Sequence, residues 1–200
     1  MNDRERFRQT LTFGKPDRVP LSPGGPREST LRAWYQQGLP EGVDWYPYLM
    51  QTIGLPYQPA KEPRISLDSA FKMIPTFEEK VIERRDGHYI VQDWMGAITE
   101  ISDEFDYTYI RSAKDFVTRK WHRFPVQNWQ EWEEKMKWRF DPAHPQRYPD
   151  NFEELCEKLN QRESVFQITV SGPFWQLREW VGFENLCLMM IEQPDLVEEM

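Results

Sequence analysis

Three side chains in this sequence belong to types that bind ligands, and each stands just after a predicted strand. Arg27 follows a short strand near residues 18–22, while Trp175 and Arg178 follow a mostly apolar strand at residues 164–170. A guanidinium group can hold a carboxylate through paired hydrogen bonds, and an indole ring can stack on a flat ligand. We therefore predict that these residues bind a small-molecule substrate. The structural alternatives are a surface arginine beside a helix N-terminus and a tryptophan packed between a helix and a sheet.

The strands that would position these residues are expected to be parallel and buried. The run Ser164–Val170 is short and mostly apolar, as is typical of a strand covered on both faces. A third strand of this kind is predicted near residues 65–74. Helices are predicted at about residues 3–13, 30–37, 43–53, 129–140, 152–159, 174–180, 184–191 and 194–200. In the first helix Phe7 and Leu11 share one face, and Asn128 is the expected N-cap of the helix at residues 129–140. The spacing of Trp129, Trp132 and Met136 predicts a core stripe. This alternation of strands and helices indicates an α/β fold.

An antiparallel insertion interrupts this alternation at about residues 78–111. Glu79–Arg85 and His88–Trp94 alternate between apolar and polar residues, and the dipeptide Asp86-Gly87 separates them. Such a dipeptide between two alternating runs is the strongest short-range signal of a β-hairpin. Two further strands are predicted, at residues 97–101 and 107–111.

The sequence ends inside a predicted helix. Pro194 and Asp195 suit a first helical turn, and neither a glycine cap nor a basic last turn follows before Met200. A closed barrel of eight parallel strands takes about 250 residues, and three or four such strands are predicted here. We therefore expect residues 1–200 to be the N-terminal part of one larger domain, truncated at its C-terminus.

Several short segments occur in an order and at a spacing that match one enzyme superfamily. They are Arg4–Phe7, Lys15–Pro20, Leu31–Trp34, Gly38–Pro40, Ser171–Trp175, Gly182–Glu184 and Gln193–Val197. Together they resemble the N-terminal part of the uroporphyrinogen decarboxylase superfamily. That superfamily also includes zinc-dependent methyltransferases, which move methyl groups from corrinoid proteins to thiols. The resemblance implies a TIM-type (β/α)8 barrel with its site at the carboxyl ends of the strands.

The positions that resemble functional residues of the decarboxylase itself carry other residue types here. A loop with two substrate-binding arginines resembles Pro23–Arg27, which has one arginine in a displaced position. The central aspartate of the decarboxylase corresponds to Pro75, which cannot accept hydrogen bonds through its side chain. Its pocket tyrosine corresponds to Trp180. We therefore expect true decarboxylation of uroporphyrinogen to be absent.

The resemblance then favours a methyltransferase acting with a corrinoid protein, or a divergent decarboxylase. The methyltransferases hold zinc through a His-x-Cys pair and a distant cysteine, in the later part of the superfamily's length. His88, His122 and His144 have no cysteine two positions later, so we expect no cofactor in this segment and zinc only in a full-length protein. The alternative is a non-catalytic or decayed half-barrel that forms homo-oligomers or needs a partner chain. In either case we expect the segment alone to be inactive.

Composition excludes several other classes of function. The net charge is −8, and nucleic-acid binders usually carry a basic face, so we expect no nucleic-acid partner. The sequence has two cysteines, no signal peptide and no apolar run of membrane-spanning length, which indicates a cytoplasmic protein without membrane contact. The acidic residues around the predicted hairpin, Asp93, Asp103, Glu104 and Asp106, are interpreted as solvated surface charge.

Overall fold

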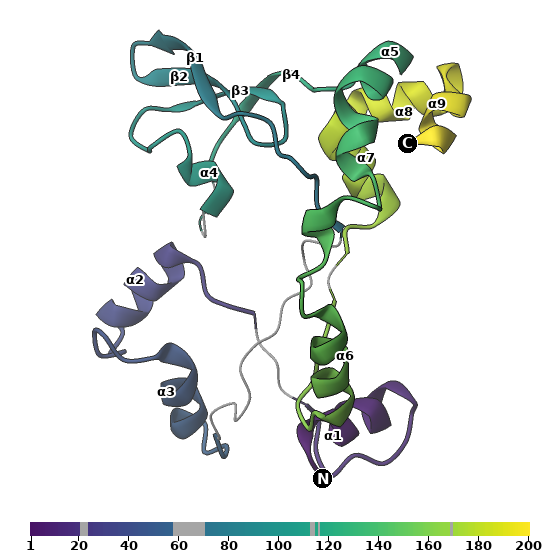
Figure 1. Cartoon of the computed structure of the whole chain (residues 1–200). Helices are drawn as coiled ribbons and strands as arrows, with labels where there is room; N and C mark the ends of the chain where they lie inside the picture. Colours follow the sequence, from purple (N-terminus) through teal and green to yellow (C-terminus); the bar gives the residue numbers. More distant parts are fainter. Residues whose placement is uncertain (21–23, 58–70, 113–114, 116, 169) are drawn as a thin grey trace. The chain divides into compact units, whose positions relative to one another are not determined.

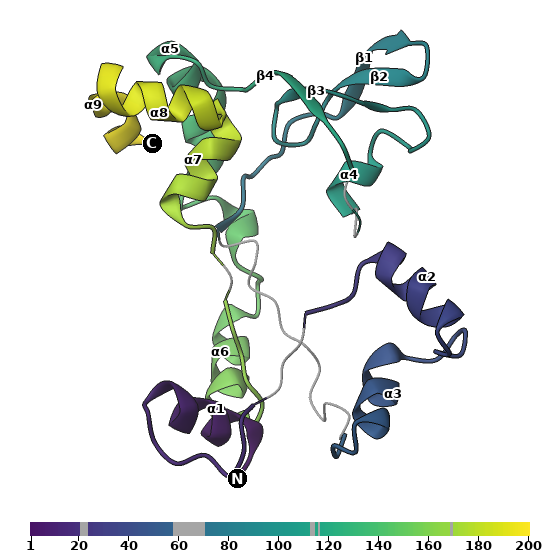
Figure 2. The same ribbon diagram turned by 180° about the vertical axis from the view of Figure 1, so that it is seen from behind.

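The computed structural model forms two compact units (Figures 1 and 2). Unit 1 comprises Met1–Ile65 and Glu153–Gln167, and unit 2 comprises Ser66–Phe152 and Ile168–Met200. The structure describes residues 1–20, 24–57, 71–112, 115, 117–168 and 170–200. Within those ranges, none of the helices combines the length and the apolar character needed to cross a bilayer.

The described residues of unit 1 form helices and no strands. They are α1 (Asp3–Leu11), α2 (Glu28–Gln36), α3 (Trp45–Thr52) and nearly all of α6 (Phe152–Gln161). The predicted start of α1 is confirmed, because the Asn2 side chain accepts a hydrogen bond from the backbone N–H of Glu5. Asp44 caps α3 in the same way through the N–H of Tyr46.

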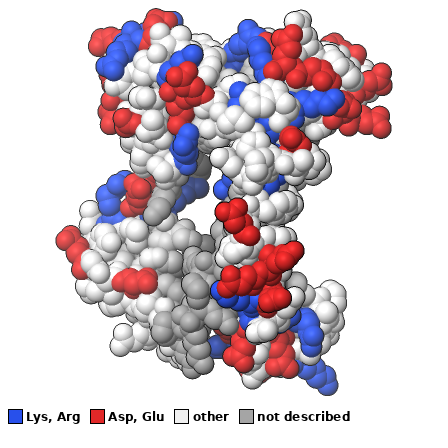
Figure 3. Space-filling view, viewed as in Figure 1, with Lys and Arg blue, Asp and Glu red and all other residues white. Residues whose placement is uncertain are grey.

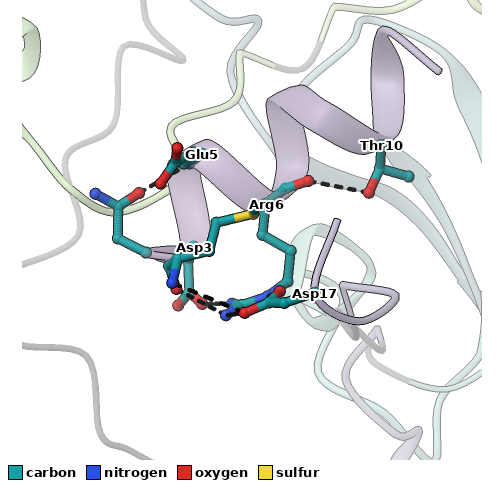
Figure 4. Close-up of polar contacts among 7 residues, drawn as sticks. Asp3, Glu5, Arg6, Thr10 and Asp17 are labelled. Atoms are coloured by element: carbon teal, nitrogen blue, oxygen red, sulfur yellow. Dashed lines mark hydrogen bonds and ion pairs between the residues drawn. The ribbon is translucent and has the colours of Figure 1, made fainter. Parts of the chain in front are cut away.

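The buried side chain of α1 belongs to an arginine and not to an apolar residue. Arg6 is 7% exposed, and its Nε and Nη2 donate to the two carboxylate oxygens of Asp17 at 2.6 and 3.0 Å (Figure 4). Its Nη1 donates to Asp3, so the guanidinium joins the helix to the loop that follows it. The hydrogen bond from Arg6 lowers the pKa of Asp17 to about 2. Leu11, predicted to share an apolar face with Phe7, is 64% exposed.

The sheet of unit 2 confirms the predicted hairpin and extends beyond it. Its four strands are all antiparallel and lie in the order β1-β2-β3-β4. They are β1 (Lys80–Arg85), β2 (His88–Gln92), β3 (Ile98–Ser102) and β4 (Lys120–Arg123). Gly87 closes the first turn with a φ of 74°, a conformation that glycine adopts without a steric penalty.

The strand predicted at residues 107–111 is wrong. A short helix, α4 (Tyr109–Ser112), occupies this stretch, and the fourth strand lies at Lys120–Arg123. Asp106 explains the difference, because its carboxylate accepts a hydrogen bond from the N–H of Thr108 at 2.9 Å and starts a turn. The alternation of apolar and polar residues at positions 107–111 therefore did not indicate a β-strand.

Four further helices of unit 2 lie around its main apolar core, next to the sheet (Figures 1 and 2). They are α5 (Trp129–Glu131), α7 (Pro173–Val181), α8 (Phe183–Glu192) and α9 (Pro194–Glu199). After α5 the chain continues through a π-helical segment, Trp132–Met136, and 3₁₀ turns at Lys137–Phe140 and Pro145–Arg147. The buried core consists of Val126, Trp132, Met136, Leu177, Trp180, Val181, Leu186, Met189 and Leu196.

The parallel strands predicted from sequence are not observed at the described positions. Residues 18–20, 71–74, 164–168 and 170 lie outside any ladder, whereas the rest of these runs falls outside the described residues. Val165, Ile168 and Val170 are 38–55% exposed, so this apolar run lacks the cover that a parallel strand needs on both faces. What the structure shows is a mixed arrangement of helices with one open antiparallel sheet.

Asn128 is the predicted N-cap of the helix that carries the buried residues Trp132 and Met136. Its Oδ1 accepts a hydrogen bond from the N–H of Glu131 at 2.9 Å. Replacing Asn128 by alanine is expected to lower the free energy of unfolding by about 1 kcal/mol, because the N–H of Glu131 loses its acceptor. Urea unfolding followed by tryptophan fluorescence measures this loss. Asn128→Ser is the matched control, since serine also caps, and an equal loss in both variants would contradict the capping role.

Candidate functional site

A buried carboxylate, Asp93, lies at the turn between β2 and β3 of unit 2. Its side chain is 2% exposed, and Oδ1 accepts hydrogen bonds from the backbone N–H groups of Met95 and Ala97, both at 3.0 Å. The turn needs Gly96, which has a φ of 89° and lies against the ring of Phe77. The local sequence therefore uses one oxygen of Asp93 to close the turn and leaves Oδ2 for other contacts.

Arg119, just before β4, faces the second oxygen of Asp93. Its Nη1 lies 3.6 Å from Oδ2, and both atoms are buried with no hydrogen-bond partner among the described residues. The guanidinium carbon also lies 4.4 Å from the centre of the Trp121 ring. Burial raises the pKa of Asp93 above its usual range, although the two backbone hydrogen bonds and Arg119 act in the opposite direction.

Helix α7 brings a second arginine–indole pair and a second carboxyl group to the same region. The Arg178 guanidinium carbon lies 3.7 Å from the centre of the Trp175 ring, and this indole is 53% exposed. Glu179 is half-buried, hydrogen-bonds Trp175 and interacts electrostatically with Arg178, Arg119 and Asp93. Burial raises the pKa of Glu179, while Arg178, the Trp175 hydrogen bond and Arg119 act against the shift. We call these six residues the arginine–indole cluster: Asp93, Arg119, Trp121, Trp175, Arg178 and Glu179.

The chemistry of this cluster combines two complementary groups. An exposed indole with a guanidinium against it presents both a flat apolar face and a positive charge. The two carboxyl groups lie in surroundings that favour their protonated form, which is the property required of a general acid. The cluster can therefore bind a planar, negatively charged molecule and hold a proton next to it.

The residues predicted as ligand-binding fall into different units. Trp175 and Arg178 belong to unit 2 and contact each other. The alternative of a tryptophan packed inside between helix and sheet is wrong for Trp175, because more than half of its side chain is exposed. Arg27 belongs to unit 1, where it is exposed and occupies the N-cap position of α2 without capping it through its side chain.

Asp93, Arg119 and Glu179 were not predicted as site residues. Asp93 was interpreted as solvated charge, which is wrong because the β2–β3 turn and Arg119 enclose it. Asp103, Glu104 and Asp106 are exposed, as predicted. The spacing Asp93-x-x-Gly96 is a turn signal that could have separated Asp93 from the other three.

Charges of both signs are mixed on one face of the protein. On the face shown in Figure 3, basic side chains lie beside acidic ones and form no continuous basic patch. Two hollows are lined by none of the cluster residues: one of about 500 Å³ in unit 2, beside Trp132 and Trp138, and one of about 280 Å³ in unit 1, between Trp34 and Trp45. Aromatic rings form part of the lining of both.

The zinc site that the superfamily resemblance implies lies in the later part of the superfamily's length, outside this segment. No group of three histidine, cysteine or acidic side chains in this part of the chain is arranged to hold a metal ion. His122 instead hydrogen-bonds Glu100 at 2.8 Å, and His144 accepts from the N–H of Gln146. Cys156 and Cys187 are free and belong to different units.

In comparisons with protein-family models, curated proteins and solved structures, nothing matches this chain.

Proposed function

We propose that this chain belongs to the uroporphyrinogen decarboxylase-like superfamily and acts as a methyltransferase together with a corrinoid protein. The observation that carries the proposal is the Trp175–Arg178 pair on α7, the helix that follows the apolar run at residues 164–170. Trp175 is also the last residue of Ser171–Trp175, one of the segments that resemble the superfamily.

In this proposal the protein's own residues bind and orient the ligand. The exposed face of Trp175 stacks on the flat part of a substrate or corrin ring, and Arg178 interacts with carboxylate groups at its edge. Arg27 is proposed to hold a further substrate carboxylate, on the basis of its sequence position alone. The closed barrel and a zinc ion in a full-length protein belong to the same proposal.

A divergent decarboxylase is a second candidate, and Glu179 favours it. When a carboxylate leaves as CO₂, its bonding electrons remain on the substrate carbon, which must then take up a proton. Glu179 lies next to the arginine that would bind the carboxylate, and burial raises the pKa of this glutamate, so that it can carry the required proton.

A non-catalytic protein that depends on a partner chain is the third candidate, and its exposed apolar residues favour it. Val165, Ile168 and Val170 form an extended apolar run with no ladder partner in the described residues. Such a run is suited to pairing with further strands. Light scattering tests this candidate, because a stable, compact monomer in solution contradicts it.

Replacing Trp175 by alanine is expected to weaken corrinoid binding about tenfold, equal to ~1.4 kcal/mol, because the stacking surface is lost. The measurement is a titration of the purified protein with hydroxocobalamin, followed by the corrin absorption. Trp129→Ala is the matched control, since Trp129 is similarly exposed, at 45%, but lies outside the arginine–indole cluster. If wild type does not bind hydroxocobalamin, or if both variants bind like wild type, the proposal fails.

A further inference from the structure

The smaller of the two hollows, about 280 Å³ in volume, is formed by one short stretch of unit 1. Its described lining residues all fall between positions 34 and 52, on α2, on α3 and at the turn after α2. On α3 they are spaced three, four and seven positions apart, so they share one face of the helix. These residues are Trp45, Tyr48, Leu49 and Thr52. The geometry of the hollow therefore depends on two helices that are neighbours in the sequence.

Three aromatic rings line this hollow. The ring centres of Trp34 and Trp45 lie 5.9 Å apart and the rings are inclined at 46°, so they form a corner and not a parallel stack. The hydroxyl of Tyr48 donates a hydrogen bond to the carbonyl oxygen of Gly38 at 3.2 Å, which ties the third ring to the turn after α2. All three aromatic side chains are partly exposed, whereas Leu39, at 8%, is the buried residue of the lining. A ligand in the hollow can therefore contact the rings.

The charged residues of this stretch are acidic. Between positions 33 and 60 the sequence has two charged residues, Glu41 and Asp44, and no lysine, arginine or histidine. Both are exposed and belong to the loop that joins α2 to α3. Asp44 directly precedes Trp45, and the N–H of Tyr46 holds its Oδ1 at the start of α3. The charges of this loop therefore favour a cation over an anion.

The faces of aromatic rings attract cations as well, and tryptophan does so most strongly. A quaternary ammonium group suits such walls, because it has no N–H groups that need acceptors and its methyl groups pack against the rings. The volume lies at the lower end of the range for ligand pockets, which limits the ligand to a small one.

We propose that this hollow binds a small quaternary ammonium cation, with Trp34, Trp45 and Tyr48 as its aromatic walls. The inference does not depend on the proposed function, since the arginine–indole cluster belongs to unit 2.

The test compares choline with neohexyl alcohol, in which a carbon atom replaces the charged nitrogen while the shape is kept. Dissociation constants of both are measured for the whole wild-type chain by ligand-observed proton NMR. Because only choline interacts with the rings as a cation, it should bind about tenfold more tightly than the alcohol. Equal affinities would show that the hollow selects apolar shape and not charge, and a lack of choline binding would also refute the proposal. This comparison does not depend on the folding of any variant.

Variants of Trp34 locate the site. Trp34→Leu removes one wall but stays apolar, so choline should bind about three- to tenfold more weakly and the alcohol nearly as before. Trp34→Phe keeps a ring and should lose less affinity for choline. Trp129→Leu is the matched control, since Trp129 is 45% exposed but lies in unit 2 and lines neither hollow. Circular dichroism checks that each variant is folded.

Unchanged choline binding in Trp34→Leu overturns the inference, as does an equal loss in Trp129→Leu, because either result places the choline site elsewhere. The hydroxocobalamin titration is read separately, since it tests Trp175 of unit 2. Either proposal can therefore fail while the other stands.

Discussion

Replacing Gly182 by alanine is expected to lower the free energy of unfolding of unit 2 by about 2–4 kcal/mol. Gly182 joins α7 to α8 with a φ of 86°, a conformation that residues with a Cβ rarely adopt. A Cβ at this position would lie 2.5 Å from the ring of Phe124, and the Phe124 ring is itself stacked on Trp121. The methyl group therefore adds steric overlap to backbone strain, at a place where the ring cannot move freely.

Tryptophan fluorescence during urea unfolding measures this effect on the correct unit, because seven of the nine tryptophans belong to unit 2. Gly87→Ala is the matched control, since Gly87 has a similar φ of 74° but no atom lies within 4 Å of a Cβ built there. This control should lose about 1 kcal/mol from backbone strain alone. Equal losses in the two variants would show that the contact with Phe124 contributes nothing.

Replacing Arg147 by methionine is expected to destabilise unit 2 by about 3–4 kcal/mol. Arg147 is 3% exposed, and its guanidinium donates hydrogen bonds to the carbonyl oxygens of Asp141, Lys72 and Arg139 at 2.6, 2.8 and 3.0 Å. Methionine fills much of the same volume but donates none of these bonds. The carbonyl groups of segments far apart in the sequence would then lose a charged donor.

Two further variants make this result specific. Arg147→Lys keeps the charge but lacks the planar fork, so we expect an intermediate loss. Arg85→Met removes an arginine that is about half-exposed and paired with Glu83 on the sheet, and such surface pairs contribute little to stability because water screens them. If Arg147→Met is no more destabilising than Arg85→Met in the same urea experiment, the proposed role of Arg147 is wrong.

The charged residues around Arg119 show why a functional site is harder to predict from sequence than a helix or a strand. Trp175 and Arg178 could be paired from their spacing on one helix, because residues three apart face each other there. Asp93 and Arg119 are 26 positions apart, and their contact depends on the way that β3 and β4 return past the β2–β3 turn. Nothing in the neighbouring residues of Asp93 indicates that an arginine will cover it.

What the sequence alone determined is the set of local structures that neighbouring residues control. The turn at Asp86-Gly87, the cap at Asn128 and the helices around the core each depend on contacts within a few residues, so composition and spacing were sufficient to predict them. Of the stripe predicted as core, Trp132 and Met136 are buried in it, whereas Trp129 is 45% exposed.

Only the tertiary structure decided which charges are buried and which apolar residues stay exposed. Arg6 and Asp93 are enclosed, whereas Leu11 and the run around Ile168 remain open to solvent. Burial depends on the surfaces that pack against a residue, and these come from segments distant in the sequence. For the same reason the apolar run at residues 164–170 predicted a covered parallel strand, but no strand of the described residues pairs with it.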